Sequence, residues 1–492
     1  MRKHFQFSCL VFIILGYACS GAAQSVPQKD QERDRLIAAS QAGAMPLFFD
    51  IAALNGPEVL PGDFKNGNEF LLRGGLPNFF DKLKHKKSGN IGYLGGSITR
   101  AGNMYRVQSA KYIQSMFPGS KLQGINAGVS GTGTDLGACR LYDQLLKYHP
   151  DLVFVEFAVN QAFPDGMEGI IRQIIKYDPT IDICILYTIY EGQAKYYAEG
   201  KVPPNIAALE RIAAHYNLPS IHMGLQAGIL EAEGKLLWKA GQVLSQERSQ
   251  VPGQKHNPTL SPGQLIFSQD GVHPSEAGGS LYAGAIARAM EKMKENDQPK
   301  AHVMPAGLIA DHWEDATMYA PKEIATFSRE WSSVDPNEID QFRQFSGWFP
   351  YVMKADQPGA SFTFKFQGEM FGFFDIGGPE SGQLIVELDG KKVKLNPGRF
   401  PHMGKAVPEG EAEVAVLNRF NSFCNNRYRG QYHIIEVEPG THEVRLSISP
   451  VIPDKRKILG EKQLDDITQH PEKYNRTAAY IGKILLRGKM IR

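Results

Sequence analysis

The sequence contains few of the features that mark disulfide-rich or metal-binding proteins. Only 5 of the 492 residues are cysteines, and two of these, Cys9 and Cys19, lie close to the N-terminus. Three scattered cysteines remain, and they do not make a disulfide framework. No CxxC or HExxH spacing occurs anywhere in the chain. We therefore expect no structural or catalytic metal.

The charge is almost balanced, and long apolar runs are missing after the N-terminus. The formal net charge is +2, which gives no sign of a nucleic-acid partner. The one dense basic run, "DKLKHKK" at 81–87, is interpreted as a solvated helix end. No later stretch is apolar enough to predict an integral membrane span.

The N-terminus has the pattern of an export signal. A basic start is followed by "FSCLVFIILGYAC", an apolar stretch that is short for a bilayer span. Small residues then predict cleavage near Ala23–Gln24, so residues 1–23 are expected to be a signal peptide. The alternative is a lipoprotein anchored through Cys19, but Gly16-Tyr17-Ala18 is a poor processing site. We expect an exported protein, periplasmic or extracellular.

The rest of the chain divides into segments with different hydrophobic patterns. Residues 24–87 are a lead-in segment without a clear period. Between 88 and 300, apolar runs alternate with helix-like stretches, which predicts a parallel sheet covered on both faces. The expected strands are 91–95, 123–127, 152–159, 181–189 and 219–223. The expected helices are 104–116, 136–147, 167–177, 205–216 and 275–294.

Residues 320–492 have a different pattern. "SFTFKFQ" at 361–367 alternates strictly, as a half-buried strand does. Hairpin turns are predicted at Asp389-Gly390 and at Pro439-Gly440, each between two short strands. The pattern predicts an antiparallel β-sandwich of the jelly-roll kind.

Polar and small residues follow the expected strands where each one ends. Ser97 follows the first strand, Gly131 lies in the loop after the second, and Asn160 follows the third. "DGVHP", with Asp270 and His273, precedes the last helix. Since ligands of open parallel sheets bind beyond the carboxyl ends of the strands, these side chains are expected to meet at one edge.

The set is suited to acyl transfer. A serine hydroxyl needs a neighbouring base, and His273 is the candidate base for Ser97. Asp270 would hold the imidazole in the correct tautomer. The backbone N–H groups of Ser97 and Gly131 and the amide of Asn160 are the candidate oxyanion hole.

These blocks resemble the SGNH hydrolases, also called the GDSL family. The resemblance rests on "GGSIT", "NAGVSG", "AVN" and "DGVH", which occur in the family's order across about 88–295. Gly96 stands where the family usually has Asp, a variant seen among its carbohydrate-esterase-like members. Ala158 and Gln161 depart from the family's pattern beside Asn160. No GxSxG elbow exists in the chain, which disfavours an α/β-hydrolase.

The resemblance implies a three-layer α/β/α, flavodoxin-like domain and a serine esterase that needs no cofactor. Together with export it favours removal of O-acetyl groups from polysaccharide or oligosaccharide, so the expected partner is an acylated carbohydrate. A lipase or lysophospholipase is the enzymatic alternative. An inactive carbohydrate-binding protein is the alternative of another class. The sequence assigns no oligomeric state.

Four further features leave alternatives open. Glu156 lies inside an apolar strand, so we expect a structural partner such as an arginine or backbone N–H groups. Arg100 would face the substrate or form an ion pair. The glycine-rich run at 126–137 is a weak candidate for phosphate binding, because a nucleotide site would ordinarily follow the first strand. Segment 418–433 is either a sugar-facing loop or an ordinary surface loop.

Overall fold

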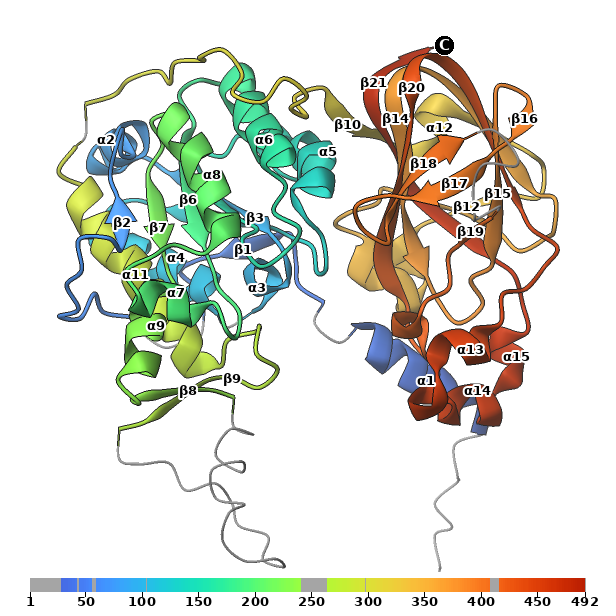
Figure 1. Ribbon diagram of the computed structural model, residues 1–492, viewed down its shortest axis with the longest axis horizontal. Helices are drawn as coiled ribbons and strands as arrows, with labels where there is room; N and C mark the ends of the chain where they lie inside the picture. Colours follow the sequence, from blue (N-terminus) through green and yellow to red (C-terminus); the bar gives the residue numbers. More distant parts are fainter. Residues whose placement is uncertain are drawn as a thin grey trace, which may run out of the picture.

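The computed structural model describes residues 28–41, 44–54, 59–102, 104–239, 263–296, 298–407 and 416–491 (Figure 1). The predicted signal peptide and Cys19 lie outside the described residues. Within the described part of the chain, no helix is both long and apolar enough to cross a membrane. Cys139, Cys184 and Cys424 are all buried and free.

The first half of the chain builds a seven-stranded sheet in the order β1-β4-β3-β5-β6-β7-β2. The five inner strands are parallel, and the short edge strands β1 and β2 are antiparallel to their neighbours. All five expected strands are present. The bounds are β1 Phe48–Asp50, β2 Phe70–Leu71, β3 Gly89–Gly95, β4 Leu122–Gly128, β5 Leu152–Glu156, β6 Asp182–Tyr187 and β7 Ser220–His222.

Helices lie on both faces of this sheet. The chain steps from β3 outward to β4 and then back across β3 to β5, so right-handed crossovers place the helices before and after β4 on opposite faces. Accordingly α4 packs on α11, whereas α5 packs on α6 and α6 on α8 (Figure 1). These helices are α4 Tyr105–Met116, α5 Thr134–Gln144, α6 Pro164–Tyr177, α8 Pro204–His215 and α11 Glu276–Met293. The shorter helices are α2 Pro77–Lys84, α3 Ser97–Arg100, α7 Ala194–Ala198 and α9 Leu225–Ala232, with a β8–β9 ribbon, Leu236–Lys239 and Leu265–Ser268.

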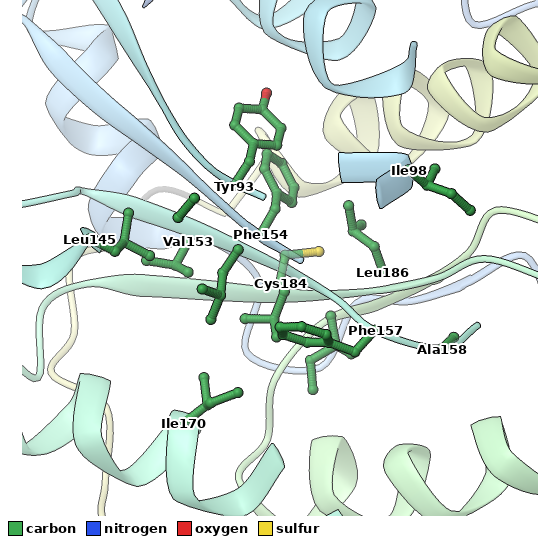
Figure 2. Packing of buried hydrophobic residues seen from close by; sticks show 14 of the residues in the cluster. Tyr93, Ile98, Leu145, Val153, Phe154, Phe157, Ala158, Ile170, Cys184 and Leu186 are labelled. Atoms are coloured by element: carbon green, nitrogen blue, oxygen red, sulfur yellow. The ribbon is translucent and has the colours of Figure 1, made fainter. Parts of the chain in front are cut away.

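The central strands are mainly apolar because both of their faces are buried. Tyr93 stacks on Phe154 of the neighbouring strand, with ring centroids 5.2 Å apart, and its hydroxyl contacts Ser109 of α4. The preceding residue, Gly92, faces Leu145 beyond the end of α5, on the opposite side. Figure 2 shows this packing around β3, β5 and β6.

The C-terminal half builds one connected, curled sheet of twelve strands, mainly antiparallel. Three long strands form its centre: β14 Ser361–Gly377, β20 Arg429–Ile448 and β21 Ala479–Ile491. The other strands are β10 Ala316–Tyr319, β11 Ala325–Phe327, β12 Ser332–Val334, β13 Val352–Ala355, β15 Gln383–Leu388, β16 Lys391–Lys392, β17 Lys394–Pro397, β18 Met403–Val407 and β19 Leu417–Asn418. The alternating phenylalanines Phe362, Phe364 and Phe366 are buried inside it, as their period predicts.

One of the two predicted hairpin turns is wrong. Asp389-Gly390 does join β15 to β16, and both residues have positive φ, 53° and 77°, as a type I′ turn requires. Pro439-Gly440, however, lies within β20, which continues to Ile448. The pairing with β14 shifts there, opposite Gly368–Met370, so the proline lies in a bulge where no ladder N–H is needed.

The lead-in segment is divided between the two halves of the molecule. Helix α1, Gln28–Gln41, packs on η3, Asp340–Phe345, of the C-terminal half. Strands β1 and β2 extend the N-terminal sheet at its two edges. In Figure 1, α1 lies beside the small helices α13 Lys455–Leu459, α14 Asp465–Gln469 and α15 Pro471–Tyr474.

The two halves are joined by polar contacts. The carboxylate of Asp135, at the start of α5, is fully buried and bonds to Nε2 of His402 at 2.9 Å and to the hydroxyl of Tyr432 at 3.0 Å. Asp165 pairs with Arg399 at 3.0 Å. The β-rich half therefore lies directly against the loops that follow β4 and β5.

Candidate active site

Ser97 lies where β3 ends and the short helix α3 begins. Its Oγ is 2.7 Å from Nε2 of His273, although 176 residues separate the two in the sequence. Ser97, at the end of β3, therefore lies within hydrogen-bond distance of His273, which precedes α11.

His273 is in turn oriented by Asp270. The distance from Nδ1 of His273 to Oδ2 of Asp270 is 2.6 Å. The other oxygen, Oδ1, accepts the backbone N–H groups of Val272 at 2.9 Å and His273 at 2.8 Å. Partial burial raises the pKa of this carboxyl, but the hydrogen bonds from His273 and Val272 outweigh it and hold the pKa below its usual value. The carboxylate is thus charged where it faces the imidazole.

The two glycines before Ser97 are needed because other groups pack directly against them. A Cβ at Gly95 would lie 2.1 Å from Oγ1 of Thr99 and 2.5 Å from the carbonyl of Glu156. A Cβ at Gly96 would lie 2.2 Å from Oδ1 of Asn160. Any side chain at position 96 would displace Asn160.

Glu156 supports this turn from behind. The residue is fully buried at the end of β5, and its carboxylate accepts the hydroxyls of Thr188 at 2.5 Å and Thr99 at 2.8 Å. Burial raises the pKa of the Glu156 carboxyl, and the hydrogen bonds from the two threonines and the Gly96 N–H oppose that rise. The expected backbone N–H partner is present, and hydroxyl groups take the place of an arginine.

Gly131 and Asn160 lie in loops that contact one another. The N–H of Thr134, just after the Gly131 loop, donates to the carbonyl of Gln161 at 3.2 Å. Oδ1 of Asn160 is buried and accepts no hydrogen bond from the described residues. Gly131 has a φ of 72°, which favours glycine before any ligand is considered.

Arg140 is a residue of the site that the sequence analysis missed. It is fully buried on α5 and donates to the carbonyls of Ala127 at 2.5 Å and Gly95 at 3.0 Å. One guanidinium thus joins the ends of β3 and β4, the two strands whose loops carry Ser97 and Gly131. A helical arginine between apolar neighbours was the available sequence signal.

Arg100 makes no ion pair among the described residues. Its guanidinium lies over the ring of Trp348, 4.7 Å from the centroid, and burial lowers its pKa to about 10. Arg100 therefore connects α3 to the β-rich half through a cation–π contact.

One group of possible metal ligands exists in the part of the chain that the structure describes. Glu32, Asp466 and His470 place one ligand atom each within 4.8 Å of one another. The ammonium of Lys473 already bonds to both carboxylates, to Asp466 at 3.1 Å. This cluster joins α1 to α14 and α15, and the ammonium of Lys473 is the cation that it holds.

No protein-family model matches the chain, and no curated protein matches it. Among solved structures, a two-domain esterase (CEX) active on acetylated mannans, co-crystallised with mannopentaose, is similar over 86% of this chain and 98% of its own, with 19% identity and a TM-score of 0.58. A second structure of a two-domain esterase (CEX) active on acetylated mannans gives the same values. An acetyl xylan esterase, Axe2 from Geobacillus stearothermophilus, is matched over 41% of this chain and 94% of its own, at 20% identity and a TM-score of 0.30. The chain thus shares its α/β-plus-β fold with the mannan-active esterase.

Proposed function

We propose that this protein is an exported serine esterase of the SGNH type that removes O-acetyl groups from polysaccharide or oligosaccharide. The observation that carries the proposal is the chain of two short hydrogen bonds from Ser97 through His273 to Asp270. In this proposal residues 1–23 are the signal peptide, 24–87 the lead-in, 88–300 the catalytic domain and 320–492 the accessory β domain.

Acylation begins at Ser97. Its Oγ attacks the acetyl carbonyl carbon while Nε2 of His273 takes the hydroxyl proton. Asp270, which accepts the Nδ1 proton of the ring, stabilises the imidazolium that forms. The negative charge on the former carbonyl oxygen is stabilised by the N–H groups of Ser97 and Gly131 and by the amide of Asn160.

The intermediate then collapses. The bond from carbon to the sugar oxygen breaks, and His273 gives its proton to the departing sugar hydroxyl. Ser97 is left acetylated. Water attacks the acetyl carbon while His273 takes one of its protons. The bond from carbon to Oγ of Ser97 then breaks, His273 gives its proton to Oγ, and acetic acid leaves.

The substrate class follows from chemistry and likeness together. Ester hydrolysis by these residues needs no cofactor, since the base, the orienting carboxylate and the oxyanion donors all come from the chain. The shared fold with an esterase active on acetylated mannans supports a carbohydrate O-acetyl ester. The lipase alternative requires a long apolar acyl groove beside Ser97.

The test is release of acetate from acetylated glycans and of nitrophenol from short- and long-chain esters. Ser97→Ala should lower kcat by at least about a thousandfold, because the bond-forming oxygen is removed. Ser115→Ala, at an exposed serine of α4, is the matched control and should behave as the wild type. Preference for long-chain esters would favour the lipase alternative, and equal activity of Ser97→Ala would overturn the proposal.

A further inference from the structure

A cavity of about 800 Å³ lies between the two halves of the molecule. The α/β half contributes Ser130, Gly131, Thr132 and Gln161 to its wall. The β-rich half contributes segments 395–404, 416–423 and 429–433, which include most of the asparagine- and arginine-rich segment 418–433. Because Gly131 is also an oxyanion candidate, the cavity opens beside the proposed reaction centre.

The wall of this cavity is cationic. Three arginines line it, Arg399, Arg419 and Arg429, and among the residues that the structure describes no aspartate or glutamate does. Two of the three are neutralised by partners outside the wall. Arg399 pairs with Asp165 at 3.0 Å, and Arg419 makes a two-pronged pair with buried Asp375, at 2.7 and 3.0 Å.

Arg429 differs from the other two. Among the described residues it has no carboxylate within ion-pair distance, and the polar contact of its side chain is a 3.4 Å hydrogen bond to the carbonyl of Gly430. The guanidinium lies over the ring of Phe423, 4.7 Å from the centroid. Burial lowers the pKa of Arg429, and the neighbouring charge of Arg427 acts in the same direction.

Arg429 also lies against the loop that carries Gly131. A Cβ at Gly131 would lie 3.4 Å from Nη2 of Arg429, so the guanidinium faces the proposed oxyanion loop. Phe423, on its other side, is 61% exposed and offers an apolar face beside the charge. Arg429 is half-buried, and a half-buried charge with no paired carboxylate among the described residues favours an anionic ligand.

The other charges near the cavity do not change this balance. Asp135 bonds to His402 and Tyr432, and the buried guanidinium of Arg140 interacts electrostatically with it. Burial lowers the pKa of His433 well below its usual value, so that ring is neutral.

We infer that the cavity binds the carboxylate of a uronic acid in the glycan, held by the guanidinium of Arg429 beside the ring of Phe423. A guanidinium fits a planar carboxylate through two parallel N–H···O bonds. The inference rests on the proposed esterase function and narrows its substrate to acetylated acidic glycans. The acetyl group would be on the sugar at Ser97, and the uronate would be on a neighbouring sugar or side branch in the cavity.

The first experiment compares two purified acetylated xylo-oligosaccharides that differ only in a glucuronic acid branch. The wild type should have a kcat/KM about 10- to 100-fold higher on the charged one, as expected for a charge-assisted hydrogen bond, and raised salt should shrink this ratio. Equal kcat/KM values would overturn the inference. Activity on neither oligosaccharide nor any nitrophenyl ester would instead overturn the proposed function.

The second experiment uses two variants and a matched control. Arg429→Met should remove the charged-over-neutral ratio mainly through KM, and Arg429→Lys should restore part of it. Arg427→Met deletes the same charge two residues away, at an exposed side chain outside the cavity wall, and should keep the ratio. A ratio that persists in Arg429→Met, or disappears equally in Arg427→Met, would overturn the inference.

Binding gives a readout that does not depend on turnover. Ser97→Ala should bind the deacetylated, uronate-bearing oligosaccharide in titration calorimetry, and the Ser97→Ala, Arg429→Met double variant should bind it at least about tenfold more weakly. If the Arg429 variants do not fold, the wild-type ratio and its salt dependence decide the question.

Discussion

Gly96 shows how a single residue sets the distance between two others. Its missing Cβ lets Asn160 lie directly against the turn that carries Ser97. Glu156 and Thr99 hold the same turn from the opposite side by a 2.8 Å hydrogen bond. The turn that carries Ser97 therefore packs against the amide of Asn160 and is hydrogen-bonded to the buried carboxylate of Glu156.

Gly96→Ala should consequently impair the reaction more than the fold. The added methyl would push Asn160 away, and loss of one oxyanion donor costs about 10²- to 10³-fold in kcat. The measurement is kcat on 4-nitrophenyl acetate. Gly67→Ala is the control, because a Cβ there meets nothing within 4 Å. A Gly96→Ala variant with wild-type kcat would show that Asn160 does not serve the oxyanion.

At the scale of elements, the strands β3 and β4 are held together at their carboxyl ends by α5. The helix does so through Arg140, which bonds to one carbonyl of each strand and to Oε1 of Gln144 at 2.8 Å. Burial lowers the pKa of Arg140 to about 9, still high enough for the guanidinium to be charged at neutral pH. The loops bearing Ser97 and Gly131 thus share one anchor.

Arg140→Met should lower the free energy of unfolding by about 3 kcal/mol, because it removes the buried donor to the carbonyls of Ala127 and Gly95 and to Gln144. Urea denaturation followed by circular dichroism measures this. The control is Arg211→Met, at an exposed arginine of α8, which should change the midpoint little. Equal midpoints for the two variants would contradict the anchoring role.

The elements also show where sequence patterns are reliable. The five inner strands could be predicted because burial on both faces forces continuous apolar runs. The edge strands β1 and β2, of three and two residues, were missed because so short a segment has no period. Pro439-Gly440 has the composition of a turn but forms a bulge, since the pairing of β14 with β20 determines the local backbone.

For the whole molecule, two buried histidines link stability to pH. His222 is buried in the α/β half, where its Nδ1 is 2.9 Å from the hydroxyl of Tyr197, and burial lowers its pKa to about 4. His433 is buried in the β-rich half with its pKa lowered in the same direction. Below pH 6.5 these histidines bind protons in the unfolded chain but not in the native protein. The free energy of unfolding therefore falls as the pH decreases toward 4.

Replacing His222 should therefore flatten the pH dependence of unfolding. Between pH 7 and pH 5 the wild type should lose about 2 kcal/mol through this one ring, and His222→Gln should not show that loss. Urea denaturation at the two pH values measures the difference. His85→Gln, at an exposed histidine, should keep the wild-type slope. An unchanged slope in His222→Gln would mean that the ring is protonated in the native state.

The sequence by itself determined what depends on local order. The alternation of strands and helices specified a parallel sheet, and the carboxyl ends of such strands meet at one edge whatever lies around them. Asp270 and His273, three residues apart, already shared a turn. The tertiary structure decided what depends on packing between distant segments: the contact of Gly96 with Asn160, the anchor at Arg140, and the approach of Arg429 to Gly131. Such pairs arise only when the chain has folded, because no periodicity links residues that are tens or hundreds of positions apart.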